Sequence, residues 1–274
     1  MGGYTILAID DGGYSVGVIG EGIKESFYAV KSIYGQRNLT EIKGKNDFII
    51  EYKGVKYVGG ETAFYDSHLP LQVFGETKCH LFYDISVLTA IHQYGGLNNK
   101  IILNVPIKHH NTDEKKSRIE RLKGTHTIKI NGITKTFNIA DILVAAEGAS
   151  AFWINKIPNK SYYLDIGSRT INACSVLNIN NSPRFIDSES DTFYKGIEAL
   201  SDSYDPKALA DYICGRLIRL WNKDSPHIYL LGGGCYDTIL VDEIKKYFPN
   251  AQVMDEPHLA NAKGLYELAK IAYS

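Results

Sequence analysis

Short apolar runs recur along the chain, and turn-forming residues mark where each run ends. The first run, Tyr4–Asp10, is followed by Asp-Gly-Gly and by a second run at Tyr14–Ile19, a pattern typical of a β-hairpin with a glycine turn. Thr127–Ile130 and Ile133–Ile139 flank an Asn-Gly pair, which predicts a second hairpin with a type I′ turn. The chain is therefore expected to open with paired strands and to contain a further antiparallel pair near its middle.

Other segments follow helical spacing or form short buried strands. Leu81, Ile85 and Leu88 predict a helix that Gly95 ends. Further helices are predicted at Asn111–Gly124 (opened by Thr112, with Glu114 and Arg118 four residues apart), Asp141–Trp153, Pro206–Trp221, Asp237–Phe248 and Leu259–Ala272. Further strands are predicted at Ile101–Val105, Ile228–Leu231 and Ala251–Met254.

The opening pattern repeats about half a chain later. Tyr162–Asp165 is an apolar run that ends in Asp-Ile-Gly, and Thr170–Leu177 continues it. Ile-Asp-x-Gly at Ile9–Gly12 thus has a counterpart, Leu-Asp-x-Gly, at Leu164–Gly167. Two half-chains that each begin with a hairpin and end in alternating strands and helices predict a duplicated α/β unit with a cleft between the copies.

Composition narrows the class of protein. The 274 residues include 30 basic and 31 acidic side chains, so a net charge of −1 argues against non-specific binding to nucleic acid. No apolar stretch is long enough to span a membrane, and the N-terminal apolar run soon reaches two aspartates, unlike a signal peptide. The four cysteines are scattered, which favours a reducing compartment. We therefore expect a cytoplasmic protein that contacts neither membrane nor nucleic acid directly.

The two Asp-x-Gly turns are the first candidate site. Glycine lets backbone amides approach a phosphate closely, whereas the neighbouring carboxylates of Asp10 and Asp165 need a divalent cation or a polarised water beside them. The amides suited to phosphate belong to Gly12, Gly13, Gly167 and Ser168. Alternatively, each turn is an ordinary hairpin with an Asx turn, although two matching turns in duplicated halves favour the site.

Two other features leave alternatives open. Gly232, Gly233 and Gly234 follow an apolar strand directly, and three ordered glycines suggest either close approach of a nucleoside or a tight strand–helix turn. Glu147 lies among small residues, where its carboxylate either orients a water or caps a neighbouring group.

Taken in order, these motifs resemble the bacterial actin-like proteins that segregate plasmids, the ParM group, and the short length resembles the AlfA type. The similar stretches are Ile9–Gly12 (first phosphate loop), Asn104–Ile107 with the following helix, hairpin and Ala146–Ser150 (leading to the first connector), Leu164–Thr170 (second phosphate loop), Leu230–Gly234 (adenosine motif) and Ala260–Gly264 (second connector). The resemblance implies an actin-like fold, a duplicated ribonuclease H-like α/β architecture. Domain I would comprise residues 1–157 and 255–274, and domain II residues 158–254.

The resemblance also implies roles for particular residues. Asp10 would hold Mg²⁺ through water, Asp165 would position that metal or the attacking water, and Glu147 would orient the water. The nucleotide would be bound by Asp11, Gly12, Gly13, Gly167, Ser168, Thr170, Gly232, Gly233 and Gly234. The implied cofactors are ATP or GTP with Mg²⁺.

Three departures from the family pattern change this picture. Gly17 stands where many relatives carry a phosphate-contacting lysine, so that charge is absent or comes from elsewhere, such as Arg169. Asn172 replaces an aspartate at the end of the second loop. About 50 residues separate Leu177 from Ile228, which leaves no room for the subdomain called IIB. Its loss would expose the base, so we expect similar use of ATP and GTP.

The implied function is nucleotide-dependent assembly of a head-to-tail polymer with paired strands, slow ATP or GTP hydrolysis, and plasmid segregation through a DNA-binding adaptor protein. One alternative is a small-molecule kinase of the same superfamily, which needs an aspartate base near the end of Ile101–Val105; Asp113 is better explained as an N-terminal helix charge. The other is a scaffold that binds nucleotide without hydrolysing it. His109 and His110 are expected to lie in a solvated loop and not to bind a metal.

Overall fold

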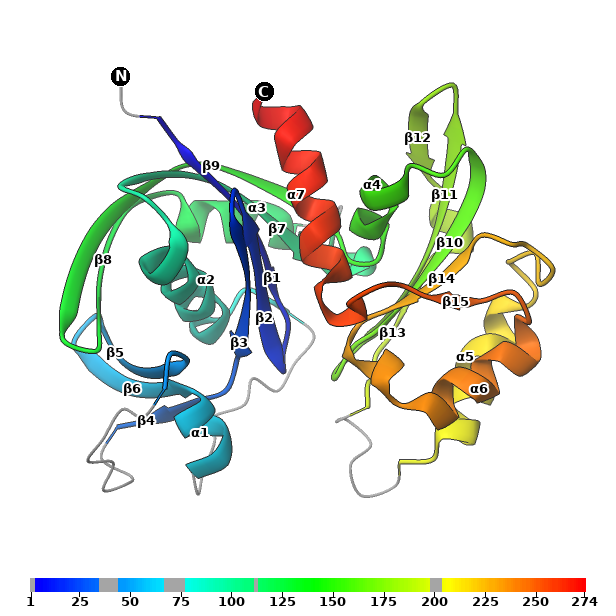
Figure 1. The fold of residues 1–274 in the computed structure, drawn as a ribbon, viewed down its shortest axis with the longest axis horizontal. Helices are drawn as coiled ribbons and strands as arrows, with labels where there is room; N and C mark the ends of the chain where they lie inside the picture. The colour runs from blue at the N-terminus through cyan, green and yellow to red at the C-terminus, as the bar shows by residue number, and fades with distance from the viewer. Residues whose placement is uncertain (1–2, 35–43, 67–76, 111–112, 198–203) are drawn as a thin grey trace. The chain divides into compact units, whose positions relative to one another are not determined.

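The computed structural model describes residues 3–34, 44–66, 77–110, 113–197 and 204–274, which form two compact units (Figure 1). Unit 1 comprises Met1–Asn104, Asn111–Val144 and Ala269–Ser274, and unit 2 comprises Val105–His110 and Ala145–Leu268. The domain boundaries at 157/158 and 254/255 that the resemblance implies differ from the limits of these units, and those boundaries stay a prediction. No helix within the described ranges is long and apolar enough to cross a membrane.

Unit 1 is built on a nine-stranded mixed sheet in the order β3-β2-β1-β7-β9-β8-β5-β6-β4. Its strands are β1 (Thr5–Asp11), β2 (Ser15–Gly20), β3 (Ile23–Tyr28), β4 (Lys31–Ile33), β5 (Asp47–Tyr52), β6 (Val55–Gly60), β7 (Asn98–Val105), β8 (Gly124–Ile130) and β9 (Ile133–Ala146). Its helices are α1 (Glu61–Asp66), α2 (Leu81–Tyr94) and α3 (Asp113–Leu122). α2 packs inside the curve of the sheet, and Tyr83–His92 are all buried, so this helix has no solvent-facing stripe (Figure 1).

Most predicted elements of unit 1 are present. The Asn-Gly hairpin is confirmed: β8 and β9 pair from Ile130 and Ile133, and Asn131 and Gly132 have φ of 51° and 83°, as a type I′ turn requires. α2 ends at Gly95, whose amide donates to the Ile91 carbonyl oxygen. The predicted charged helix corresponds to α3, although Thr112, its expected first residue, lies outside the described residues.

The helix predicted at Asp141–Trp153 was wrong. β9 continues through this segment to Ala146, with Ile142, Val144 and Ala146 buried on alternate positions. A run that is apolar on both faces shows no clear period, and β-branched residues favour the strand. Helical structure begins only beyond Gly148, in the 3₁₀ turn Ala149–Ala151 and the short α4 (Phe152–Asn155).

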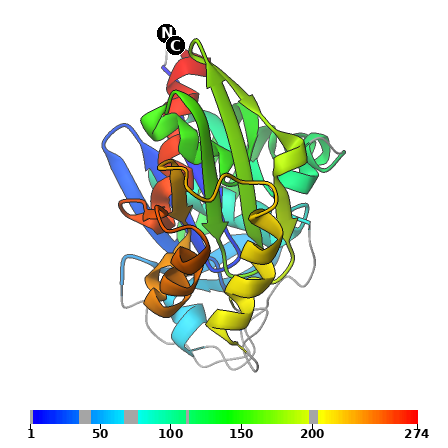
Figure 2. The ribbon, with the colours of Figure 1, turned by 90° about the vertical axis from the view of Figure 1, so that its right-hand side faces the viewer.

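Unit 2 contains a six-stranded sheet with the path β12-β11-β10-β14-β15 and β13 paired to β11. Its strands are β10 (Asn159–Ile166), β11 (Ile171–Ile179), β12 (Ser182–Phe185), β13 (Asp191–Phe193), β14 (Ile228–Leu231) and β15 (Gln252–Val253). α5 (Pro206–Leu217) and α6 (Thr238–Tyr247) lie side by side and pack on this sheet (Figure 2). α7 (Ala260–Tyr273) begins in unit 2 and ends in unit 1. The core of unit 2 joins Leu164 and Leu230 of the sheet to Ile213 and Leu240 of the helices.

The strand pairing confirms the predicted duplication. β1 is antiparallel to β2 and parallel to β7. β10 is likewise antiparallel to β11 and parallel to β14. The same three-strand arrangement thus carries the Asp-x-Gly turn in both units.

Subdomain IIB was expected to be missing, and the fold agrees. Between β13 and β14, the described residues 194–197 and 204–227 contain α5 and its flanking loops, with no additional strand. Only residues 198–203 of the predicted lead-in lie outside the described residues. The described part of this segment therefore holds one helix, where an inserted subdomain would need several elements.

Candidate nucleotide-binding site

The first Asp-x-Gly turn joins β1 to β2 in unit 1. A Cβ added at Gly12 would lie 2.8 Å from the Ser15 carbonyl oxygen, so the turn tolerates no side chain there. Asp10 precedes the turn and is partly exposed, and its Oδ1 accepts a hydrogen bond of 2.8 Å from Asn104 Nδ2 at the end of β7. The turn thus presents a glycine backbone beside one positioned carboxylate, as the sequence predicts.

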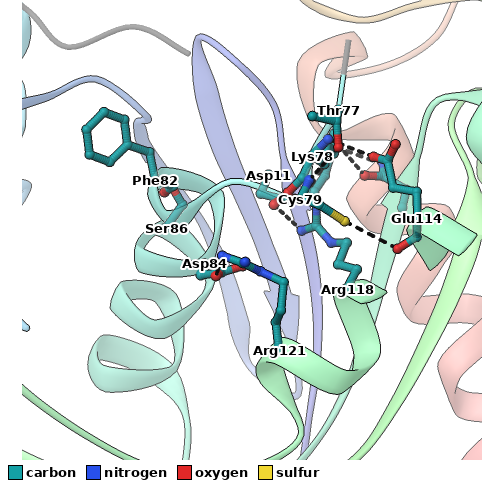
Figure 3. A network of polar contacts seen from close by, with 12 residues as sticks. Asp11, Thr77, Lys78, Cys79, Phe82, Asp84, Ser86, Glu114, Arg118 and Arg121 are labelled. Carbon is teal, nitrogen blue, oxygen red and sulfur yellow. Dashed lines mark hydrogen bonds and ion pairs between the residues drawn. The ribbon is translucent and has the colours of Figure 1, made fainter. Parts of the chain in front are cut away.

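Asp11 points to the opposite face of β1 and is fully buried. Arg118 Nη2 of α3 donates to its Oδ2, and Lys78 Nζ lies 3.5 Å from its Oδ1, so two cations converge on this carboxylate (Figure 3). The predicted role of Asp11 in binding nucleotide stays a prediction. Its carboxylate already serves a buried ion cluster, so any contact to a nucleotide would fall to the backbone.

The ion cluster was missed at the sequence level. Glu114 and Arg118 were interpreted as a helix pair, yet Arg118 is buried against Asp11, and Glu114 Oε1 accepts from the backbone N–H of Lys78 at 2.7 Å. One signal was available, because Arg118 lies four residues before the buried Leu122 and so shares its face of α3. Nothing in the local sequence marks Lys78.

The second Asp-x-Gly turn joins β10 to β11 in unit 2 and repeats the geometry of the first. A Cβ added at Gly167 would lie 2.7 Å from the Thr170 carbonyl oxygen. The Gly167 amide donates to that same oxygen at 3.1 Å. Ser168 and Thr170 are half-buried. The Gly196 amide donates to the Arg169 carbonyl oxygen at 2.8 Å, so the segment after β13 supports the outer side of this turn.

Asp165 is held by the first turn of α7. Asn261 Nδ2 donates to its Oδ2 at 2.8 Å, and Asn261 Oδ1 accepts from the Gly148 amide at 3.0 Å and from Ser150 Oγ at 2.8 Å. Asn261 is 5% exposed and was not singled out from the sequence. One amide side chain therefore fixes the predicted metal-positioning carboxylate to the segment that carries Glu147.

Glu147 is buried and lies close to the same strand ends. Its Oε2 accepts from Asn172 Nδ2 at 2.7 Å, and Asn172 pairs with Asp165 across β10 and β11. Asn172 Oδ1 in turn accepts from Thr192 Oγ1 at 2.8 Å and from the Ile107 amide at 3.3 Å. The structure thus brings Glu147 and Asp165 together within unit 2, and Asn172, the departure from the family pattern, links them.

The three glycines after β14 have different surroundings. Gly232 has φ of 89°, and a Cβ on it would lie 2.6 Å from Asp165 Oδ1. A Cβ on Gly234 would lie 2.2 Å from Ile166 Cγ2, whereas one on Gly233 would meet nothing within 4 Å. Packing against β10 therefore requires glycine at positions 232 and 234, while the backbone of Gly233 is exposed. The predicted contact of all three glycines with a nucleoside stays a prediction.

Among the described residues, no group of three or more His, Cys, Asp or Glu side chains forms a cation site. Mg²⁺ in nucleotide sites retains several waters and needs only one or two carboxylates, so a partly exposed Asp10 fits the predicted ligand type. Asp10 belongs to unit 1 and Asp165 to unit 2. That they serve one magnesium–nucleotide complex stays a prediction.

Comparison with known proteins agrees with this geometry. Residues 8–149, more than half of the chain, match the family described as "Actin like proteins N terminal domain". Similar solved structures include the AlfA filament from B. subtilis plasmid pLS32 (20% identity, 96% of this chain and 98% of that chain, TM-score 0.75) and an AlfA filament bound to AMPPNP (21%, 99% and 100%, 0.77). Another is a non-polymerisable pCBH ParM mutant (18%, 98% and 100%, 0.78). No curated protein matches. At these identities the solved structures establish the fold, and together with the family match they show that the chain belongs to the actin-like proteins.

Proposed function

We propose that this protein binds ATP or GTP with Mg²⁺ and polymerises head to tail into filaments that it disassembles by slow hydrolysis. One observation carries the proposal: the Asp-x-Gly turn occurs in both units, and in each a glycine Cβ would clash with the carbonyl oxygen three residues on. Both turns would bind the phosphates of one nucleotide. The similarity to an AlfA filament bound to AMPPNP supports this proposal.

Within this function the carboxylates have separate roles. Asp10, steadied by Asn104, would hold the hydrated metal, and Asp165, steadied by Asn261, would hold that metal or the attacking water. Bound Mg²⁺ would neutralise charge on the phosphates. Glu147 is fixed by Asn172 and would orient the water without taking up a proton permanently. Gly12, Gly13, Gly167, Ser168, Thr170, Gly232, Gly233 and Gly234 would contact the nucleotide, and Asp11 would do so through its backbone.

Head-to-tail contacts that do not close into a ring generate a filament. Nucleotide that binds the assembling conformation better favours polymer, and loss of the γ-phosphate weakens it. The net charge of −1 supplies no basic field for DNA, so we propose that a DNA-binding adaptor links the filament to a plasmid.

The test combines light scattering with electron microscopy. A non-hydrolysable triphosphate should give a rapid rise in scattering and visible filaments. Glu147→Ala should retain this assembly while phosphate release falls at least tenfold, and the matched control Glu120→Ala, an exposed glutamate of α3, should behave as wild type.

Other outcomes identify the alternatives. Nucleotide-dependent phosphorylation of a small molecule, without a rise in scattering, would indicate a kinase. A kinase needs an aspartate base near the end of β7, and among the described residues from the end of β7 to the start of α3 the one aspartate is Asp113, which is exposed. Nucleotide binding without scattering or hydrolysis would indicate a scaffold. Undiminished phosphate release by Glu147→Ala would remove Glu147 from its role.

A further inference from the structure

The first turn lacks a cation on its own hairpin. In the pairing of β1 with β2, the position opposite Asp10 is Gly17, which has no side chain to offer. Asp10 and Asp11 place two carboxylates directly before the turn. Asp10 repels a triphosphate, whereas Asp11 is buried on the opposite face of β1 beside Arg118 and Lys78. Phosphate binding at this turn therefore needs positive charge from another element.

Lys78 lies where such a charge is needed. It precedes α2, and its Nζ donates to Asn104 Oδ1 at 2.9 Å and lies 3.5 Å from Asp11 Oδ1. Asn104 donates in turn to Asp10, and the parallel pairing of β1 with β7 brings these two residues to the same edge of the sheet. The ammonium group therefore contacts Asp11 and is one amide side chain away from Asp10.

The position of Lys78 is fixed by its neighbours. Its backbone N–H donates to Glu114 Oε1 at 2.7 Å, and Figure 3 shows its side chain and that of Arg118 converging on Asp11 from separate segments. The residue is 5% exposed. A lysine this deeply buried is costly unless opposite charge compensates it, and Asp11 supplies that charge.

The distribution of charge separates the roles of the two cations. Arg118 makes the closer contact to Asp11 and balances that carboxylate. Lys78 lies farther from Asp11 and also donates to Asn104, which in turn donates to Asp10. Without Lys78, Arg118 would remain paired with Asp11, and Asn104 would lose its contact with a cation.

We propose that Lys78, reaching the first Asp-x-Gly turn from the segment before α2, supplies the positive charge for nucleotide phosphates that Gly17 cannot provide. The inference rests on the proposed nucleotide binding and deepens it. Lys78 would thus bind phosphate from a segment outside the β1–β2 hairpin. Arg169, the substitute considered from sequence, belongs to the second turn, in unit 2.

The experiment removes the charge and keeps a hydrogen-bond donor. In Lys78→Gln, the amide can still donate to Asn104 while the ammonium is lost. Affinities for fluorescent analogues of ATP and of adenosine are measured with Mg²⁺ present. We expect at least a tenfold loss of ATP affinity with adenosine affinity within twofold of wild type. The matched control is Lys116→Gln, an exposed lysine of α3, which should leave both affinities unchanged.

Each outcome decides the matter. ATP affinity like that of wild type in a folded Lys78→Gln would overturn the proposal, and so would an equal loss for ATP and adenosine, which indicates a structural role only. If Lys78→Gln does not fold, Lys78→Arg keeps the charge and must bind ATP within fivefold of wild type; a folded Lys78→Arg with a greater loss overturns the proposal. Wild-type protein that binds no nucleotide would instead refute the proposed function itself.

Discussion

Lys31, the first residue of β4, has its ammonium group buried in unit 1. Its Nζ donates to the Ala29 carbonyl oxygen at 2.7 Å and to Ser86 Oγ at 2.6 Å. Burial lowers the pKa of Lys31 from 10.5 to about 7, although the charge of Asp11 opposes the shift. Between these two pKa values the unfolded chain binds a proton that the folded chain does not. Stability should therefore rise as the pH increases from 7.

We predict that the free energy of unfolding of the wild type rises between pH 7 and pH 8.5 by about 1.5 kcal/mol more than that of Lys31→Met. Urea unfolding at several pH values measures it, with Lys116→Met as the exposed-lysine control. The window ends near pH 8.5 because burial raises the pKa values of Cys174, Cys214 and Cys235, and their unfolded thiols ionise above that pH. Parallel pH profiles for wild type and Lys31→Met would contradict the prediction.

Among single residues, the sequence alone points to those that belong to local motifs, but not to those whose partners lie far away along the chain. Asp10 and Asp165 each stand two residues before a glycine, in a pattern that two strands and a turn explain locally. Lys78 meets Asp11 across 67 residues, and Asn261 meets Asp165 across 96 residues. Such partners depend on how the strands and helices pack, which no local spacing encodes. A lysine before α2 looks like any other surface lysine until the fold is known.

At the scale of elements, the packing of α7 depends on glycine at position 264. A Cβ on Gly264 would lie 2.0 Å from the Ser150 carbonyl oxygen, so this helix approaches the turn after Gly148 at backbone distance. Gly215 in α5 is also helical, but a Cβ there would meet nothing within 4 Å. The two glycines form a matched pair, because helix propensity favours alanine equally at both.

We predict that substitution of glycine by alanine changes the stability in opposite directions at the two positions. Gly264→Ala should destabilise the protein by about 2 kcal/mol or more, since neither backbone can give way easily. Gly215→Ala should stabilise it by about 0.5–1 kcal/mol through propensity alone. Thermal unfolding measures both, as a fall in Tm for the first and a rise of about 2 °C for the second. A rise in Tm for Gly264→Ala would show that α7 does not pack this closely.

Element types were predictable where one local signal dominated. The Asn131-Gly132 turn requires positive φ at both positions, and the structure has it. Asp237 caps α6 by accepting from the amides of Ile239 and Leu240, as the start of the predicted helix suggests. The end of β9, after Ile139, was missed because its last residues are apolar on both faces, so only pairing within the sheet decides between strand and helix.

At the scale of the whole molecule, duplication accounts for the fold more simply than any single motif. Two sheets repeat one arrangement of three strands, and each repeat ends its first strand in an aspartate and a glycine turn. The surroundings of the two aspartates have diverged. Asp10 is held by Asn104 from a neighbouring strand, whereas Asp165 is held by Asn261 from a helix. If both turns bind phosphate, as proposed above, the two repeats position their aspartates with different supporting residues.

The shortened segment before β14 leads to the last prediction, which concerns the choice of nucleotide. Strong discrimination between bases requires buried polar groups that pair with the edge of the base. In the described part of unit 2, a single helix and its loops stand between β13 and β14, and Gly233 offers only backbone. The critical concentration for assembly should therefore differ by less than about tenfold between ATP and GTP, since one or two exposed contacts discriminate weakly. Sedimentation of filaments formed with each nucleotide measures it, with a nucleotide-free sample as the baseline. A hundredfold preference for either nucleotide would show that other residues enclose the base and supply the missing contacts.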